Sequence, residues 1–179
     1  MAGIHGHALG RLISAVGTRN DRLFNHIGAA FAVWLITIRR YIIVSACGNL
    51  VWEFTQLPLY TIWRQGTPAE NIFAALHCTG GDILIATCSL IAALLMVSRR
   101  DWPARGYVVV AGLAIAFGFS YTIYSEWLHT EVRGSWTYSD LMPRLPLIGT
   151  GLSPLMQWLA VPAAAFWSAR YRLLGYDTM

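Results

Sequence analysis

Five side chains that can exchange protons lie inside or at the end of long apolar stretches of this sequence: Glu53, His77, Asp82, Glu126 and His129. An ionisable group at membrane depth is costly unless it is paired, hydrated or neutralised, so such groups commonly belong to a functional site. A carboxyl group beside an imidazole can act as a general acid and base. We therefore predict a proton-exchanging site inside a membrane, with catalytic roles for Glu53, His77, Asp82 and Glu126.

The residues around Glu53 strengthen this prediction through their spacing. Asn49, Glu53 and Gln56 fall at positions i, i+4 and i+7, so a helix carries all three on one face. Lipid cannot satisfy the hydrogen bonds of these groups, and the face must contact protein, water or a ligand. We predict that Asn49 and Gln56 bind a ligand next to Glu53.

Two further stretches repeat the pattern. His77 and Asp82 flank the pair Gly80–Gly81, and small residues let another helix or a ligand come close to the backbone. Farther along, Thr122 precedes Glu126 and His129 with the i, i+4, i+7 spacing seen around Glu53. Three separate parts of the chain thus supply ionisable groups.

The segment that follows His129 is polar and aromatic. It contains Trp136, Tyr138 and Asp140 before Arg144. Aromatic side chains favour the boundary between membrane and water, which predicts a segment that lies on the membrane surface and caps the groups beneath it. We predict ligand-binding roles for His129, Trp136, Tyr138 and Asp140.

The composition indicates a membrane protein. Hydrophobic residues make up 56% of the chain and charged residues 12%, whereas a soluble domain carries about 25% charged residues. The formal net charge is +4, but the basic residues lie at the ends of apolar stretches and form no clustered basic face. We therefore expect a lipid bilayer around the protein and no nucleic-acid partner.

Four stretches are long enough to cross a bilayer, which requires about 20 predominantly apolar residues. They cover about residues 41–63, 72–98, 107–128 and 145–170. Residues 27–38 are too few to cross and precede two arginines, which favours an amphipathic helix at the membrane interface. The predicted fold is an all-α integral membrane protein: a cytoplasmic or interfacial segment, 1–40, followed by a four-helix transmembrane bundle, 41–175.

The arginines set the orientation, because cytoplasmic loops are enriched in basic residues. With the N-terminus inside, the outer segments hold Arg64, Arg133 and Arg144, and the inner segments hold Arg11, Arg19, Arg22, Arg39, Arg40, Arg99, Arg100, Arg105, Arg170 and Arg172. We predict an inner-membrane protein with both termini cytoplasmic. The ionisable groups then gather in the outer half of the spans, and the inner parts 83–97 and 108–119 hold no acidic, basic or histidine residue.

The last stretch contains a helix start. Ser153 and Pro154 match an N-cap serine followed by proline at the first helical position. We predict a regular helix from Pro154 to about Arg172, with an irregular approach over 145–152. Gln157 and Trp158, one turn into this helix, would lie near the polar groups.

Three functions remain open at this stage. The preferred hypothesis is binding of, or acid–base chemistry on, a membrane-soluble small molecule that resembles a lipid or an isoprenoid. A second is a metal or haem protein that uses His77, His129 and Glu126, since Glu126 and His129 have the i, i+3 spacing of carboxylate-bridged di-iron bundles. A third is a non-enzymatic subunit or assembly factor that binds another membrane protein or a second copy of itself. No catalytic signature such as GxSxG or HExxH decides between them or names a cofactor.

Overall fold

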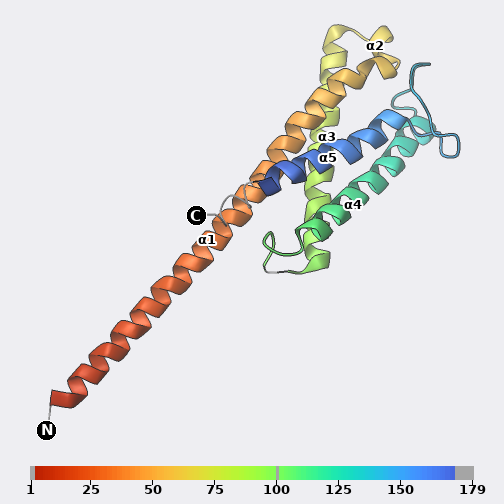
Figure 1. The fold of residues 1–179 in the computed structure, drawn as a ribbon. Coiled ribbons are helices and arrows are strands. Elements are labelled where there is room, and N and C mark those ends of the chain that lie inside the picture. Colours follow the sequence, from red (N-terminus) through yellow and green to blue (C-terminus); the bar gives the residue numbers. More distant parts are fainter. Residues whose placement is uncertain (1–2, 100, 172–179) are drawn as a thin grey trace. The chain divides into compact units, whose positions relative to one another are not determined.

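The computed structural model describes residues 3–99 and 101–171, which form helices joined by loops, the longest of them over 133–151. Two short turns interrupt them, a 3-10 turn η1 (Leu57–Leu59) and a π-helical turn η2 (Leu128–Val132). The α-helices are α1 (Gly3–Gln56), α2 (Ile62–Gln65), α3 (Pro68–Val97), α4 (Tyr107–Trp127) and α5 (Leu152–Tyr171) (Figure 1). The predicted all-α class is confirmed.

The chain divides into two compact units, Met1–Ile36 and Thr37–Met179. Helix α1 contributes residues to both, and the other helices belong to the second unit. Residues 27–38, predicted as a separate interfacial helix, are assigned to α1. No proline separates them from residue 41, and arginine is a good helix former, so Arg39 and Arg40 do not end the helix. The division of the chain at residue 40 stays a prediction.

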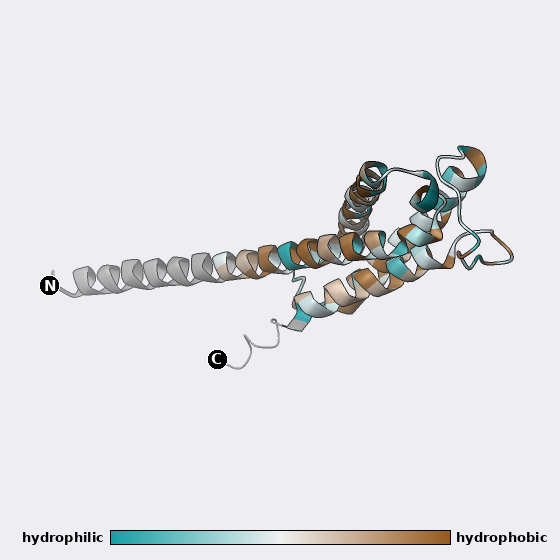
Figure 2. Cartoon of the chain, turned by 90° about the horizontal axis from the view of Figure 1, so that it is seen from above, coloured by the Kyte–Doolittle hydropathy of each residue, from teal (hydrophilic) through white to brown (hydrophobic). Residues whose placement is uncertain are grey.

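Three helical segments are long and apolar enough to cross a membrane: Gly28–Leu59, Pro68–Val97 and Tyr107–Val132. Hydrophobic residues dominate them (brown in Figure 2). The second and third agree closely with the predicted spans, whereas the first begins before residue 41. Helix α5 is not among the candidate spans found in the described residues, so the predicted count of four is not confirmed. The structure has turns and isolated bridges, and no helix, between Leu145 and Gly151.

The orientation also stays a prediction. Arg100 and Arg172 lie outside the described residues, as do the side chains of Arg11, Arg19 and Arg22.

A capping box at the first turn of α3 defines where this helix begins. The Thr67 hydroxyl accepts a hydrogen bond from the Glu70 backbone N–H at 3.3 Å, and the Glu70 carboxylate accepts one from the Thr67 backbone N–H at 2.7 Å. Pro68 occupies the first helical position, where its missing N–H costs nothing. The helix ends at Ser98, whose φ of 46° is left-handed. These signals fix where α3 begins and ends.

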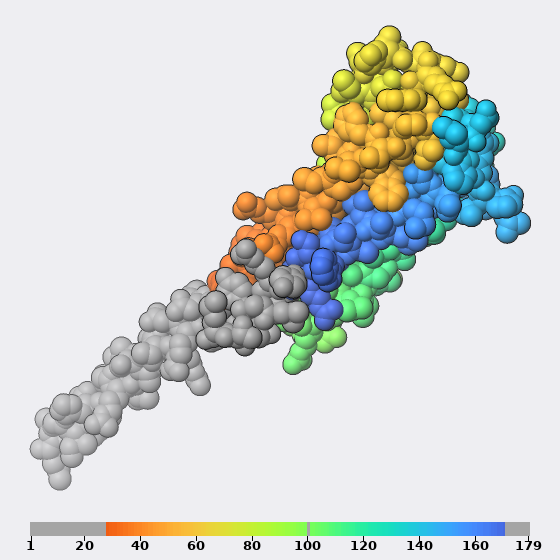
Figure 3. Space-filling model, turned by 45° about the horizontal axis from the view of Figure 1, so that its top comes forward, coloured from red at the N-terminus to blue at the C-terminus, as the bar shows by residue number. Residues whose placement is uncertain are grey.

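Glycines let α5 pack closely on its neighbours. A Cβ added at Gly48 of α1 would lie 2.9 Å from Val161, and one added at Gly118 of α4 would overlap the ring of Trp158. Close approach through small residues is a common way for membrane helices to associate. In Figure 3, α5 (blue) lies along the part of α1 that precedes η1 (orange).

Aromatic contacts hold the other end of α5. The rings of Tyr41 and Phe166 lie 4.3 Å apart, and the Tyr107 hydroxyl donates to the Phe166 carbonyl at 2.5 Å. Because Tyr41 comes from α1 and Tyr107 from α4, this end of α5 is tied to both helices. The fixed position of α5 determines where Gln157 points.

Candidate functional site

Three carboxyl groups from three helices are buried in the second unit. Glu53 of α1 is 7% exposed, Asp82 of α3 is 9% exposed and Glu126 of α4 is 7% exposed. Glu53 interacts electrostatically with both of the other groups. The structure therefore brings together three of the four residues predicted to be catalytic.

Gln157 of α5 joins two of these acids. Its Nε2 atom lies 3.0 Å from Glu53 Oε1, 2.9 Å from Asp82 Oδ2 and 3.1 Å from Asn49 Oδ1. An amide nitrogen carries two hydrogens, so three acceptors share two donors. Gln157 is itself 2% exposed, and water cannot easily supply the missing donor. We call Glu53, Asp82 and Gln157, with the amides of Asn49 and Gln56, the carboxyl cluster.

Gln56 extends the carboxyl cluster toward the start of α5. Its Nε2 donates to Glu53 Oε1 at 2.8 Å and to Gln157 Oε1 at 3.2 Å. Its own Oε1 accepts from the Ser153 hydroxyl at 2.8 Å, and the Trp52 indole donates to that hydroxyl at 3.2 Å. The polar face predicted from the sequence thus finds its partners on α5.

The carboxyl cluster has no basic partner in the part of the chain that the structure describes. There the ion pairs join Arg99 and Arg105 to Asp101, far along the sequence from the cluster. Two adjacent carboxyl groups in a medium of low dielectric cannot both carry a negative charge at low cost. The pair therefore shares a proton or meets a cationic group from outside the cluster, and either arrangement suits proton exchange.

Glu126 is held by the segment that follows α4. The Tyr138 hydroxyl donates to Glu126 Oε2 and accepts from the Gly151 backbone N–H at 3.0 Å. Two backbone hydrogen bonds fasten this segment to η1 and the residues just after it: Thr61 N–H to the Thr137 carbonyl at 3.0 Å, and Ser139 N–H to the Leu59 carbonyl at 2.9 Å. Burial, together with the nearby Glu126 carboxyl group, raises the pKa of Tyr138. The hydroxyl therefore keeps its proton and remains a donor to Glu126.

Removal of the Tyr138 hydroxyl tests this arrangement. Tyr138→Phe removes the hydrogen-bond donor to Glu126 Oε2 and the acceptor of the Gly151 N–H, and we expect a loss of about 1–3 kcal/mol of stability. Chemical unfolding in detergent micelles measures the loss. The matched control is Tyr124→Phe on α4, because Tyr124 is 53% exposed and should tolerate the change. Equal stabilities of the two variants would contradict the role of Tyr138.

Both histidines lie outside the carboxyl cluster. His77 is exposed, and its ring stacks on Phe73 with the centroids 5.7 Å apart. Five residues separate His77 from Asp82, which turns them about 140° apart on a helix, so a helix that buries Asp82 directs His77 outward. His129 stacks on Trp136 at 4.2 Å, and its Nδ1 lies 3.2 Å from the Ser135 hydroxyl.

Two other predicted ligand-binding residues, Trp136 and Asp140, lie in different surroundings. Trp136 is half-buried and interacts with the Glu126 side chain as well as with His129. Asp140 is exposed. The structure thus places Trp136 and Tyr138 beside Glu126, and Asp140 away from it on the surface.

The predicted metal ligands do not form a binding set. Among the described residues, no group of three or more His, Cys, Asp or Glu side chains is placed to hold a metal ion. Helix α4 ends at Trp127 and the chain enters the π-helical turn η2, which changes the α-helical i, i+3 relation of Glu126 and His129. The metal hypothesis therefore gains no support from the geometry of these side chains.

Sequence analysis gave Ser153 only the role of a helix N-cap, and it did not predict the contacts that Ser153, Trp52 and Cys78 make around the carboxyl groups. Ser153 lies one helical turn before Gln157, a spacing that could have shown that both face the same way. Cys78 lies one turn before Asp82 and interacts electrostatically with all three buried carboxyl groups. Nothing in the sequence indicated that the Trp52 indole would reach Ser153.

Comparisons with protein-family models, with curated proteins and with solved structures found no match to this chain. The site is therefore interpreted from its own geometry.

Proposed function

We propose that the chain is an inner-membrane protein with four spans, α1, α3, α4 and α5, and both termini in the cytoplasm. Helix α5 has 20 residues, about 30 Å at helical rise, which matches the hydrocarbon thickness of a bilayer. Its contacts with Gly48 of α1 and Gly118 of α4 support a place in the same bundle. The excess of arginine in the segments assigned to the inside supports the orientation.

We further propose that the carboxyl cluster binds, or performs acid–base chemistry on, a membrane-soluble small molecule. One observation carries this proposal: Glu53 and Asp82, from different helices, accept hydrogen bonds from the same amide nitrogen without a basic partner among the described residues. Replacing buried charged groups with apolar groups of similar size often leaves a protein equally stable or more stable. A buried acid pair is therefore better explained by proton exchange or ligand binding than by stability.

The proposed roles follow from the hydrogen bonds. Glu53 and Asp82 hold and exchange the proton, while Gln157 with Asn49 and Gln56 keeps their oxygen atoms in place. Glu126 and Tyr138 form a second proton-holding pair at the end of α4. His129 of η2 and the loop residues Trp136 and Asp140 are proposed ligand contacts nearer the surface.

Lipid analysis of purified protein tests the proposal. The wild type, Glu53→Gln and Asp82→Asn are purified in mild detergent, and retained molecules are identified by mass spectrometry after organic extraction. We expect a lipophilic molecule enriched over bulk lipid in the wild type and about tenfold depleted in both variants. Glu131→Gln is the control, because Glu131 is an exposed carboxylate close in sequence to Glu126. Identical extracts from all four proteins would overturn the proposal.

A further inference from the structure

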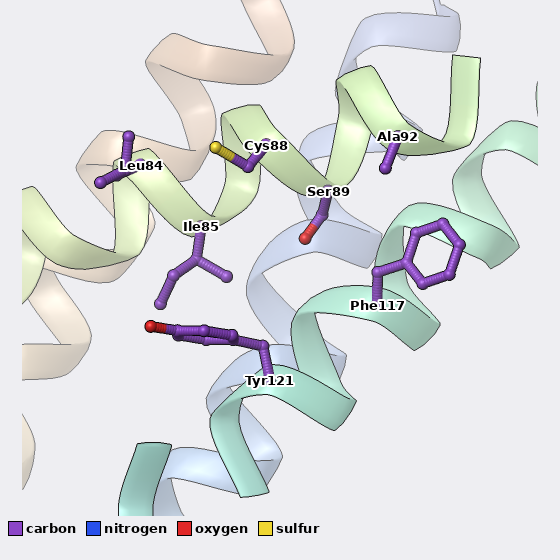
Figure 4. A pocket seen from close by; sticks show the side chains of 7 residues that line it. All are labelled: Leu84, Ile85, Cys88, Ser89, Ala92, Phe117 and Tyr121. Atoms are coloured by element: carbon purple, nitrogen blue, oxygen red, sulfur yellow. The ribbon is translucent and has the colours of Figure 1, made fainter. Parts of the chain in front are cut away.

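An apolar groove lies between α3 and α4. Its volume is about 340 Å³, within the range of small-molecule sites. The lining is apolar apart from the hydroxyls of Ser89 and Tyr121, and consists of Leu84, Ile85, Cys88, Ser89, Ala92, Phe117 and Tyr121 (Figure 4). Leu84 at 65% and Tyr121 at 49% are exposed, whereas Ser89 is 6% exposed, so the groove has an open rim and a buried floor.

The groove continues the face of α3 that carries Asp82. Ile85 and Ser89 follow Asp82 by three and seven residues, which places all three on one side of the helix. In Figure 4 the Tyr121 ring lies beneath Ile85, with its hydroxyl toward the end of the groove nearest Leu84. That end is also the one nearest Asp82 along α3. An elongated molecule in the groove would therefore have one end directed along α3 toward Asp82.

We infer that the groove holds the hydrocarbon chain of an amphipathic ligand whose polar head reaches Asp82 and Glu53. This inference rests on the proposed function and names its ligand class. Both walls belong to segments apolar enough to cross a membrane, so the open rim faces hydrocarbon and suits a chain. Glu53, Asp82 and Asn49 compete for the two N–H groups of Gln157, so the site favours a head group that donates hydrogen bonds, such as an amine or a hydroxyl.

Filling the groove tests the inference. Ala92→Trp puts an indole into the space for the chain, and Ala116→Trp is the control, because Ala116 is an exposed residue of α4 that does not line the groove. The measured quantity is the amount of enriched lipophilic molecule retained on purification. We expect about tenfold less with Ala92→Trp and an unchanged amount with Ala116→Trp.

The outcomes separate this inference from the proposed function. If Glu53→Gln loses the molecule and Ala92→Trp retains it, the groove assignment is wrong and the proposed function stands. If both variants retain it, both proposals fail. Depletion of ordinary membrane phospholipid alone by Ala92→Trp would also overturn the inference, because the groove would then hold a bulk lipid chain.

Cysteine modification provides a second test on the unaltered chain. Cys88 lines the groove, and Cys47 is an exposed cysteine of α1 that serves as an internal reference. Delipidated protein is treated with a membrane-permeant maleimide before and after reloading with the extracted molecule, and peptide mass spectrometry follows both thiols. Reloading at about ten times the dissociation constant should slow modification of Cys88 about tenfold and leave Cys47 unchanged. Equal rates at Cys88 with and without the molecule would exclude the groove as its site.

Discussion

Replacement of Gln157 by leucine is expected to destabilise the protein by about 3 kcal/mol, because it leaves buried oxygen atoms of Glu53 and Asp82 without this hydrogen-bond donor. Leucine has a similar size, so the packing of α5 changes little. The lost group is the Nε2 atom that lies within 3.0 Å of Glu53 and 2.9 Å of Asp82. Chemical unfolding in micelles, followed by tryptophan fluorescence, measures the loss.

Two comparisons separate this electrostatic effect from simple packing. Gln65→Leu on α2 is the surface control, because Gln65 is exposed. The second comparison introduces Gln157→Leu into a chain that already carries Glu53→Gln and Asp82→Asn. Neutral amides can bond to each other, so the loss there should fall to about 1 kcal/mol. An unchanged loss in the neutral background would show that Gln157 acts through packing alone.

The polar face of α1 was predictable because it depends only on helical period. Asn49, Glu53 and Gln56 recur at the spacing of one face, and in the structure all three are buried. The same reasoning applies to Thr122 and Glu126, which are buried on α4. A helix that crosses an apolar medium has few other ways to place polar groups.

The predicted membrane depth of His77 was not enough to place its side chain. Depth along the chain placed His77 with the carboxyl groups, but depth does not specify the side of the helix. The angle between His77 and Asp82 contains that information, and it turns His77 toward the exposed face. The pairing of Gln157 with Glu53 and Asp82 depends on how α5 crosses the other helices, which no local pattern encodes.

The start of α1 differs from the prediction, and the predicted span at α5 is not confirmed, each for a physical reason. Arginines were interpreted as a boundary, yet an arginine pair without a proline does not end a helix, and α1 continues through Arg39 and Arg40. In α5, Ser153 and Gln157 are polar groups that bond inside the bundle. Such groups lower the apolar character of a helix even where their side chains are buried, so composition identifies α5 less clearly than α3 or α4.

Gly118→Ala is expected to destabilise the protein by about 3 kcal/mol, at the upper end of the cost of overpacking. The added Cβ would overlap the ring of Trp158, which is only 3% exposed and has little space to move. Trp158 also interacts with the Asp82 side chain, so its displacement should disturb the carboxyl cluster as well as the fold. The unfolding temperature and the amount of lipophilic molecule retained on purification are both expected to decrease.

Gly112→Ala on the same helix is the matched control. A Cβ added at Gly112 meets no atom within 4 Å, so the only change is a better helix former in a helix interior. We expect a gain of about 0.5–1 kcal/mol there, opposite in sign to the loss at Gly118. Because the two substitutions are chemically identical, opposite signs would show that the contact between α4 and Trp158 positions α5. A tolerated Gly118→Ala would mean that α5 can shift outward, and the hydrogen bonds from Gln157 to Glu53 and Asp82 could not then depend on this contact.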